Sequence, residues 1–152
     1  MHTITIEKIT SRQILQACAS ILVDAYNSEP WNDEWTPETA FRKLDCFYKS
    51  PDFIGLLAYQ DGKLIGACVG NIEPYYTGDY FYLKEMFVSP EAQKLGVGKK
   101  LMESLKIQLA ELGIKQVILF TSNEFFPFNF YEKAAFKVME GMVMMHYESA
   151  EN

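Results

Sequence analysis

Apolar residues recur along the chain in two patterns, one typical of strands and one typical of amphipathic helices. Residues 4–6 alternate between apolar and polar, which predicts a short strand. Residues 14–25 carry apolar side chains at helical spacing, after a capping-box pattern with Thr10 as the cap. A Thr-Pro pair opens a second predicted helix over residues 36–50. The N-terminal part is therefore predicted to be strand, helix, helix.

The middle of the chain consists of three longer strand patterns. Phe53–Tyr59 and Lys63–Asn71 are rich in β-formers and flank an Asp61-Gly62 turn, which predicts a hairpin. Tyr80–Val88 is a third strand that follows the turn at Gly78. These runs predict an antiparallel core for the sheet.

Helix and strand patterns alternate in the C-terminal part. We predict a helix over 101–112, a strand over 116–121, a short helix over 127–134 and a last strand over 137–147. The last strand is apolar on both faces, which is typical of a central strand or an interface, and it suggests a homodimer. The whole pattern predicts one mixed α+β domain over 1–152, in which helices flank both faces of a mainly antiparallel sheet.

Composition narrows the class of protein. The 152 residues are 49% hydrophobic and carry a formal net charge of −6, which argues against a nonspecific nucleic-acid binder. No apolar run has membrane length, and no signal-peptide pattern occurs, so we expect a cytoplasmic protein without membrane association. Cys18, Cys46 and Cys68 have no metal spacing and are expected to be buried thiols. His2 and His146 are isolated, and no metal site is predicted.

The turn between the 80–88 strand and the following helix contains two glycines, Gly96 and Gly98. Glycines allow backbone amides to approach an anion closely, and a helix N-terminus adds partial positive charge. Lys94, Lys99 and Lys100 add cations to this turn of an acidic protein. The alternative for these lysines is a solvated helix start. The pattern favours a ligand that carries phosphate.

Two familiar phosphate loops do not fit this turn. A P-loop requires a glycine where Gln93 stands and a hydroxyl where Lys100 stands. The dinucleotide fingerprint requires a third glycine where Leu101 stands. The sequence therefore excludes both an ordinary nucleotide hydrolase and a Rossmann-type site.

The pattern Gln93-x-x-Gly96-x-Gly98, together with Phe-Tyr-Glu-Lys-Ala-Ala-Phe at 130–136, resembles the GNAT acetyltransferase superfamily. The resemblance covers nearly the whole chain and implies a GNAT-like fold that binds acetyl-CoA. Ala135 replaces the glycine that is usual in the second motif.

The resemblance also implies roles for individual residues. The cofactor-binding residues would be Phe87, Val88, Gln93, Lys94, Leu95, Gly96, Val97, Gly98 and Lys99. Phe87 and Val88 would pair through their backbone with the pantetheine arm, and the loop would hold the pyrophosphate. The family often carries an asparagine seven residues before the motif tyrosine. Glu124 holds that position here, so Asn123 beside it is the candidate contact, with Asn129 as the alternative.

Two residues are candidates for proton transfer. Glu85 is an acid in an otherwise apolar strand end and can take the proton of an amine, directly or through water. Its alternative role is a salt bridge with a lysine such as Lys84. Tyr131 matches the family's general acid, which protonates the leaving thiolate. Its alternative role is a core aromatic.

Aromatic and acidic residues form the predicted acceptor site. Trp31, Glu34 and Trp35 lie between the first two helices, and Tyr80 closes a second aromatic-acidic tract. Such residues can bind a cationic amine through cation–π contacts and charge pairing. Their alternative role is an aromatic plug over the core with solvated acids beside it.

The Pro-Trp-Asn segment at 30–32 and the strand over 83–88 resemble the subgroup that includes aminoglycoside 6′-N-acetyltransferases. We therefore predict an acetyl-CoA-dependent N-acetyltransferase that acts on the primary amine of a small cationic acceptor. Glu85 or a water would be the base and Tyr131 the acid. The alternative is a noncatalytic acyl-CoA-binding or sensing module, suggested by the departures at Ala135 and Glu124.

Overall fold

A computed structural model describes residues 3–150 of the chain, and these residues divide into two compact units. The first unit ends at Phe120 and the second begins at Thr121. All strands found in the described residues belong to the first unit.

Five strands form one mixed sheet in the order β1-β2-β3-β4-β5. Their bounds are β1 Ile4–Lys8, β2 Phe53–Gln60, β3 Lys63–Glu73, β4 Tyr80–Val88 and β5 Val117–Ile118. The first four strands are antiparallel neighbours. β5 runs parallel to β4, with Phe81 opposite Val117 and Tyr82 opposite Ile118. The sheet is mainly antiparallel, as predicted, although β5 is shorter than the expected 116–121.

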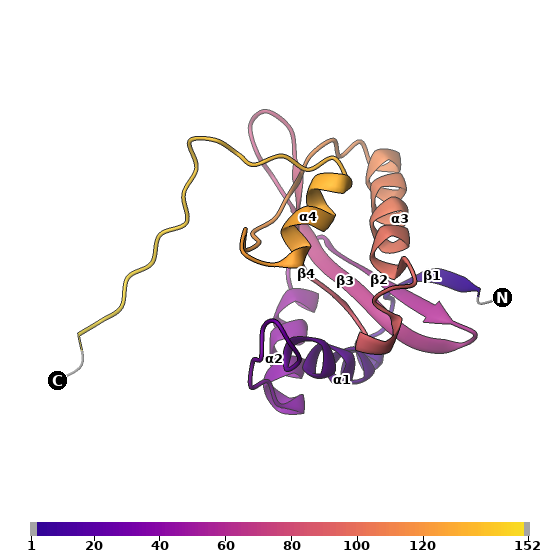
Figure 1. The fold of residues 1–152 in the computed structure, drawn as a ribbon. Coiled ribbons are helices and arrows are strands. Elements are labelled where there is room, and N and C mark those ends of the chain that lie inside the picture. The colour runs from indigo at the N-terminus through magenta and orange to yellow at the C-terminus, as the bar shows by residue number, and fades with distance from the viewer. Residues whose placement is uncertain (1–2, 151–152) are drawn as a thin grey trace. The chain divides into compact units, whose positions relative to one another are not determined.

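Helices cover both faces of this sheet (Figure 1). In the first unit they are η1 Arg12–Ile14, α1 Leu15–Tyr26, α2 Pro37–Tyr48, η2 Pro90–Ala92 and α3 Val97–Glu111. α1 and α2 share a buried cluster with Leu57, Ala67 and Phe87 of the sheet. Neighbouring residues of a strand face opposite sides, so buried Leu56 and Cys68 face the side of α3. The predicted α+β fold class is confirmed.

Of the two predicted helix caps, the one at Thr36 is confirmed and the one at Thr10 is not. Thr36 caps α2, where its hydroxyl accepts from the Thr39 N–H at 3.1 Å. The predicted cap at Thr10 is wrong, because the hydroxyl of Ser11 accepts from the Gln13 N–H at 3.2 Å and opens η1. Both residue types can cap, so the sequence alone leaves a shift of one position open.

The predicted hairpin forms between β2 and β3. Asp61 and Gly62 have φ angles of 50° and 83°, and Gln60 lies opposite Lys63. Positive φ at both central residues is the signature of the type I′ turn, which matches the twist of the flanking strands.

A buried carboxylate connects η1 to α2. Asp45 accepts from the Arg12 guanidinium at 2.7 and 3.0 Å and pairs with Lys49 at 2.9 Å. These charge-assisted bonds hold the pKa of the Asp45 carboxyl well below its usual range. The Arg12–Asp45 pair thus holds η1 against α2, the helix that carries Lys43.

The second unit contains α4, Phe126–Lys133, which ends in a Schellman motif. Phe136 N–H donates to the Tyr131 carbonyl at 2.9 Å, and Ala135 N–H donates to the Glu132 carbonyl at 3.0 Å. Ala135 adopts φ 74°, the left-handed conformation that favours glycine. The position where the GNAT motif carries glycine is therefore the position where the backbone requires a left-handed residue.

The prediction of a last strand over 137–147 is wrong, because the structure assigns no strand to these residues. The large apolar side chains of this segment are exposed: Val138, Met139, Met142, Val143, Met144, Met145 and Tyr147. A strand needs a paired neighbour, and the sequence pattern does not specify which neighbour that is.

Two expectations from composition concern the cysteines and the membrane. Cys18 and Cys68 are buried free thiols, whereas Cys46 is exposed, which corrects the expectation for that residue. Burial raises the pKa of both Cys18 and Cys68 to about 12, so neither is a thiolate nucleophile near neutral pH.

No helix between residues 3 and 150 is long and apolar enough to cross a membrane.

Candidate active site

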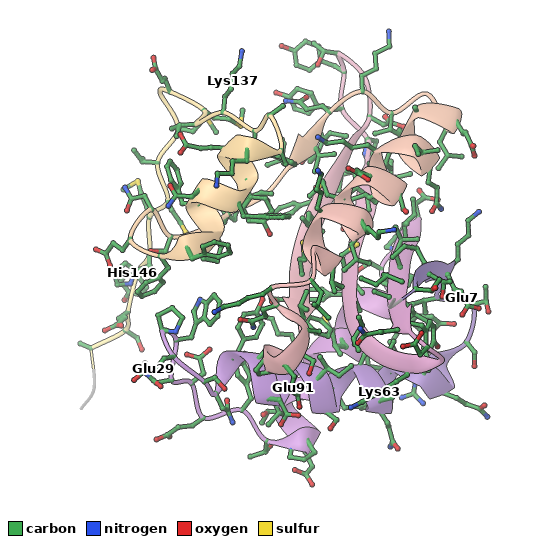
Figure 2. The ribbon with its side chains drawn as sticks, turned by 45° about the vertical axis from the view of Figure 1, so that its right-hand side comes forward. Glu7, Glu29, Lys63, Glu91, Lys137 and His146 are labelled. Carbon is green, nitrogen blue, oxygen red and sulfur yellow. The ribbon has the colours of Figure 1, made fainter. Side chains whose placement is uncertain are left out.

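The turn between β4 and α3 is held by its own hydrogen bonds. Ser89 N–H donates to the Ile65 carbonyl at 2.7 Å, and Ala92 N–H donates to the Ser89 carbonyl at 2.9 Å. The Ser89 hydroxyl also donates to the Glu91 carboxylate. Figure 2 shows Glu91 on this turn, where the ribbon passes from β4 toward α3. The turn therefore gives the loop that follows a fixed start.

The N-terminus of α3 is open for an anion. Gly96 is the N-cap, with φ 77°, and the cap makes no side-chain hydrogen bond. The first helical bond at this end runs from the Lys100 N–H to the Gly96 carbonyl at 3.1 Å. The amides of Val97, Gly98 and Lys99 therefore precede the helical ladder and point along the axis beyond its end. Such an end, with its partial positive charge, fits a phosphate group.

Side chains around this end supply only positive charge. Lys94, Lys99 and Lys100 are exposed, and the first turn of α3 contains no acidic residue. Lysine at a helix start is unfavourable for the helix dipole. A phosphate ligand would remove this conflict, because it would be attracted both by the lysines and by the amides.

The remaining loop residues have separate tasks. The Gln93 side-chain amide donates to the Val88 carbonyl at 3.2 Å, which ties the loop to the end of β4. Val97 is fully buried and anchors the helix start, whereas Leu95 is exposed. Gln93 thus positions the loop in this structure.

The outer edge of β4 carries backbone groups that β3 does not use. In an antiparallel pair, only every second residue of a strand directs its backbone N–H and C=O groups to the neighbouring strand. The hydrogen bond from the Ser89 N–H to the Ile65 carbonyl shows which residues of β4 do so toward β3. Phe87 therefore directs its backbone groups to β3, and Met86 and Val88 direct theirs to the other edge. β5 pairs with β4 only at Phe81 and Tyr82, so it does not cover this part of the edge. Of the two residues predicted to contact the cofactor through their backbone, Phe87 therefore pairs with β3 and Val88 faces the other edge, as Met86 does.

A β-bulge interrupts β4 between this free edge and β5. Val69 lies opposite Glu85 and Gly70 lies opposite Leu83, so Lys84 is the extra residue. Bulges bend a strand and re-aim its side chains, and they are common beside active sites. Here the bulge sets the direction of Glu85.

Glu85 lies in a mostly buried position between α1 and α2. Its carboxylate is 3.8 Å from the Lys43 ammonium, and its side chain is 17% exposed. Burial raises the pKa of Glu85, while Lys43 and a hydrogen bond with Tyr26 lower it and Asp33 raises it further. The Tyr26 hydroxyl also lies 3.0 Å from the Met86 carbonyl, so its single proton can be donated to that carbonyl or to Glu85. Glu85 is therefore a carboxylate whose proton affinity is set toward neutral pH.

Trp35 connects the predicted acceptor segment to this carboxylate. Its backbone exchanges two hydrogen bonds with the Asn27 side chain, at 2.8 and 2.9 Å, and its indole N–H donates to Asp33 at 3.1 Å. The Lys43 ammonium lies 5.6 Å from the centre of the Trp35 ring. The structure thus brings Trp35 and Glu85 to the same lysine.

The other residues of this segment form the rim of an open hollow. Trp31 packs edge-on against Tyr26, with ring centres 5.3 Å apart. The hollow is lined by Asn32, Asp33, Glu34, Trp35 and Thr39. Glu34 therefore lines the same hollow as Trp35, and Trp31 contacts Tyr26, whose hydrogen bond lowers the pKa of Glu85.

Tyr80 is not brought to this region. It lies at the other end of β4, about 16 Å along the strand from Glu85 at 3.3 Å per residue. Its hydroxyl donates to the Glu73 carboxylate at 2.9 Å, and this bond raises the pKa of Tyr80. The expected acceptor contact at Tyr80 is therefore not supported.

Tyr131 belongs to the second unit, where two aromatic rings hold it. Its ring centre lies 5.2 Å from that of Phe130 and 5.5 Å from that of Phe136. The contact with Phe136 is the apolar pairing that accompanies a Schellman motif. The side-chain direction of Tyr131 is thus tied to the end of α4.

Asn123 also belongs to the second unit and precedes α4. It lies in a turn in which the Glu124 N–H donates to the Ser122 hydroxyl at 3.1 Å, and its own side chain is exposed. The structure leaves this amide available at the surface of the turn.

A family model for the acetyltransferase (GNAT) family matches residues 15–136. The chain belongs to this family. It is a GNAT acetyltransferase, and the family uses acyl-CoA. The match includes β4, the glycine loop and α4, which are the elements described above.

Solved structures support the same fold at low sequence identity. The chain is similar to the aminoglycoside N-acetyltransferase AAC(6′)-Iy in complex with CoA, at 17% identity and TM-score 0.73, covering 98% of this chain and 97% of that one. It is also similar to a soil metagenomic aminoglycoside acetyltransferase in complex with sisomicin, at 16% identity, TM-score 0.71 and 97% coverage of each chain. A possible acetyltransferase from Clostridium difficile 630 gives 14% identity and TM-score 0.79, covering 97% and 99%. No curated protein matches.

Three residues of this acetyltransferase were missed from the sequence: Lys43, Tyr26 and Met86. Lys43 precedes Phe47 by one helical turn, and its ammonium lies 5.5 Å from that ring. A lysine one turn before an aromatic residue of the same helix was the sequence signal that could have identified Lys43 as part of the site. The salt-bridge alternative for Glu85 named Lys84, but the Lys84 ammonium lies 3.5 Å from the centre of the Tyr82 ring.

Proposed function

We propose that this protein transfers an acetyl group from acetyl-CoA to the primary amine of a small cationic acceptor. The observation that carries the proposal is one continuous path along β4. It runs from the buried Glu85 at the bulge, along the part of the β4 edge at Met86 and Val88 that β5 does not cover, to the uncapped start of α3. The Met86 and Val88 carbonyls already accept from Tyr26 and Gln93, so their N–H groups are the ones that remain for a ligand. Carboxylate, strand edge and anion site are the features that an amine, a pantetheine arm and a diphosphate require.

The cofactor would be held by backbone groups more than by side chains. The amides from Gly96 to Lys99 would bind the pyrophosphate, with Lys94 and Lys99 adding charge. Leu95 would pack beside the bound group, and Val97 fixes the helix start. Met86 and Val88 would pair with the pantetheine arm, and Asn123 would contribute its amide. When bound, acetyl-CoA supplies the activated acetyl group.

Proton transfer would be carried by Glu85 and Tyr131. Glu85, directly or through an ordered water, takes a proton from the acceptor ammonium and leaves a neutral amine that can attack. Tyr131 gives its phenolic proton to the sulfur as the carbon–sulfur bond breaks. A raised pKa suits Glu85 to this task, because a base with a pKa nearer neutrality accepts a proton more readily.

The acceptor would bind at the hollow beside α2. Glu34 and Asp33 supply negative charge, and Trp31 and Trp35 supply aromatic rings. This chemistry recognises an ammonium group. A structural neighbour in complex with sisomicin supports the same class of acceptor, since sisomicin is a polyamine.

The alternative, a noncatalytic acyl-CoA-binding or sensing module, rests on Glu124 and Ala135, where the chain departs from the family motifs. The two functions differ in turnover. We would measure thiol release from acetyl-CoA with a panel of amines that includes sisomicin, and measure CoA binding by calorimetry. Amine-dependent thiol release that Glu85→Gln abolishes supports the enzyme. CoA binding without turnover on any amine supports the module.

Three broader expectations belong to the same proposal. The two units would act together as one acetyltransferase domain in the cytoplasm. The exposed apolar segment over 137–147 would pair with a second copy of the chain to give a homodimer.

A further inference from the structure

Lys43 occupies a position with the chemistry of an ammonium-binding site. Its Nζ lies 3.8 Å from Glu85 Oε2, 5.6 Å from the Trp35 ring centre and 5.5 Å from the Phe47 ring centre. A carboxylate and two aromatic faces around one cation form the arrangement by which proteins recognise alkylammonium groups.

The carboxylate that pairs with this lysine is itself surrounded by groups from α1 and from the loop before α2. Glu85 projects from β4, Tyr26 from α1, and Asp33 from the loop that precedes α2. Tyr26 bonds to Glu85, and Asp33 acts on Glu85 through its charge. Lys43 is the cation at the centre of this group.

We infer that Lys43 is a specificity-determining residue that occupies the position of the acceptor's ammonium. This inference rests on the proposed function. An incoming amine has to displace Lys43 from Glu85 and Trp35 before Glu85 can take its proton. Displacement is feasible, because the Lys43 side chain is 37% exposed and lysine is flexible.

The internal ammonium selects acceptors by the number of positive charges. A monoamine regains only the contacts that Lys43 gives up, so its net gain is small. A polyamine also reaches the acids of the rim, Asp33 and Glu34, and can displace the lysine. Lys43 therefore discriminates against monoamines in favour of polyamines.

The test is Lys43→Met, which keeps the aliphatic stem against the rings and removes the charge. The probes are pentylamine and sisomicin, each titrated by calorimetry and assayed for KM and kcat. Because an exposed ion pair or cation–π contact contributes about 1 kcal/mol, we expect pentylamine affinity to rise about fivefold. We expect a smaller change for sisomicin. In Lys43→Met, the acidic limb of the pH–rate profile should move to higher pH, because Lys43 lowers the pKa of Glu85 in the wild type.

Two variants serve as controls. Lys43→Arg keeps the charge and should retain the wild-type preference within about twofold. Lys84→Met removes a lysine next to Glu85 in sequence whose ammonium lies over Tyr82, and it should leave pentylamine affinity unchanged. Circular dichroism checks folding, and Lys43→Gln replaces Lys43→Met if that variant does not fold.

Unchanged or weaker pentylamine binding in Lys43→Met would overturn the inference. Weaker binding would show that the Lys43 side chain supports the acceptor site and does not compete for it. The calorimetric result does not depend on turnover. Absence of acetyl-CoA binding or thiol release would instead contradict the proposed function and leave the calorimetric result valid.

Discussion

Two segments of this chain have strong strand patterns, and only one forms a strand. β4 spans Tyr80–Val88 and pairs with β3 along its length and with β5 at its start. The segment over 137–147 is also rich in apolar residues, yet no strand is assigned there in the described chain. A strand pattern shows that a segment can be paired, whereas pairing itself depends on a neighbour distant in sequence.

The candidate site residues are divided in the same way between β4 and the C-terminal unit. β4 runs directly into the glycine loop and α3, so Glu85 and the anion site are connected by a short stretch of backbone. Tyr131 lies in the other unit, and its role depends on contacts that its own sequence neighbourhood does not determine.

Glu85→Gln tests the chemistry of β4 and carries the largest expected effect. Removing a positioned base typically costs 10²–10⁴-fold, so we expect kcat to fall about 1000-fold while CoA binding is retained. In the wild type, activity should fall as pH decreases through the raised pKa of Glu85, because protonation removes the base. A pH profile of kcat in both proteins is the measurement. Wild-type turnover in the variant would remove Glu85 from the mechanism.

Gly70→Ala tests the pairing that holds β4. A Cβ at Gly70 would lie 2.1 Å from the Tyr82 carbonyl oxygen and 2.6 Å from the Phe81 ring, so β3 and β4 would have to separate. We expect unfolding free energy to drop by about 3 kcal/mol. The matched control is Gly141→Ala in the C-terminal segment, where no atom lies within 4 Å and φ is 87°. Only backbone strain of about 1 kcal/mol is expected there. Equal losses in urea denaturation would contradict the contrast.

Tyr131→Phe tests the second unit. Loss of the phenolic proton donor should lower kcat about 100-fold and leave CoA affinity within about twofold. The ring contacts with Phe130 and Phe136 remain in this variant. Steady-state kinetics and calorimetry separate the two effects. An unchanged kcat would return Tyr131 to a purely structural role.

Ala135→Gly should stabilise the protein by about 1 kcal/mol. The residue adopts φ 74° at the C′ position of α4, where an alanine is strained and a glycine is not. Thermal denaturation should show a higher Tm. Ala134→Gly is the control: Ala134, the C-cap, has φ −88°, and its substitution should bring no stabilisation. A lower Tm for Ala135→Gly would contradict the strain argument.

Met144→Glu should change folding stability by less than about 0.5 kcal/mol, because Met144 is exposed. If the segment over 137–147 pairs with a second copy, the charge should instead abolish dimers seen by light scattering. A wild-type monomer at all concentrations would contradict the homodimer.

Local sequence features predicted much of the fold and part of the site. The Asp61-Gly62 turn, the Thr36 cap and the glycine loop depend on neighbouring residues, so their chemistry can be seen in sequence. Glu85 meets Lys43 only because α1 and α2 pack together on one face of the sheet, and this contact joins residues 42 positions apart. Tyr80 stands at the start of β4, five residues before Glu85, and its aromatic-acidic neighbourhood alone does not show which group it contacts. The ladder phase that selects Met86 over Phe87 depends on the pairing with β3.

The central claim is that the backbone amides at the start of α3 bind the diphosphate of the cofactor. Amide chemical shifts followed by NMR during titration with CoA test it directly. We predict the largest shifts at Gly96, Val97, Gly98 and Lys99, with much smaller shifts when pantetheine, which lacks phosphate, replaces CoA. Saturable CoA binding that leaves these four amides unshifted would contradict the account.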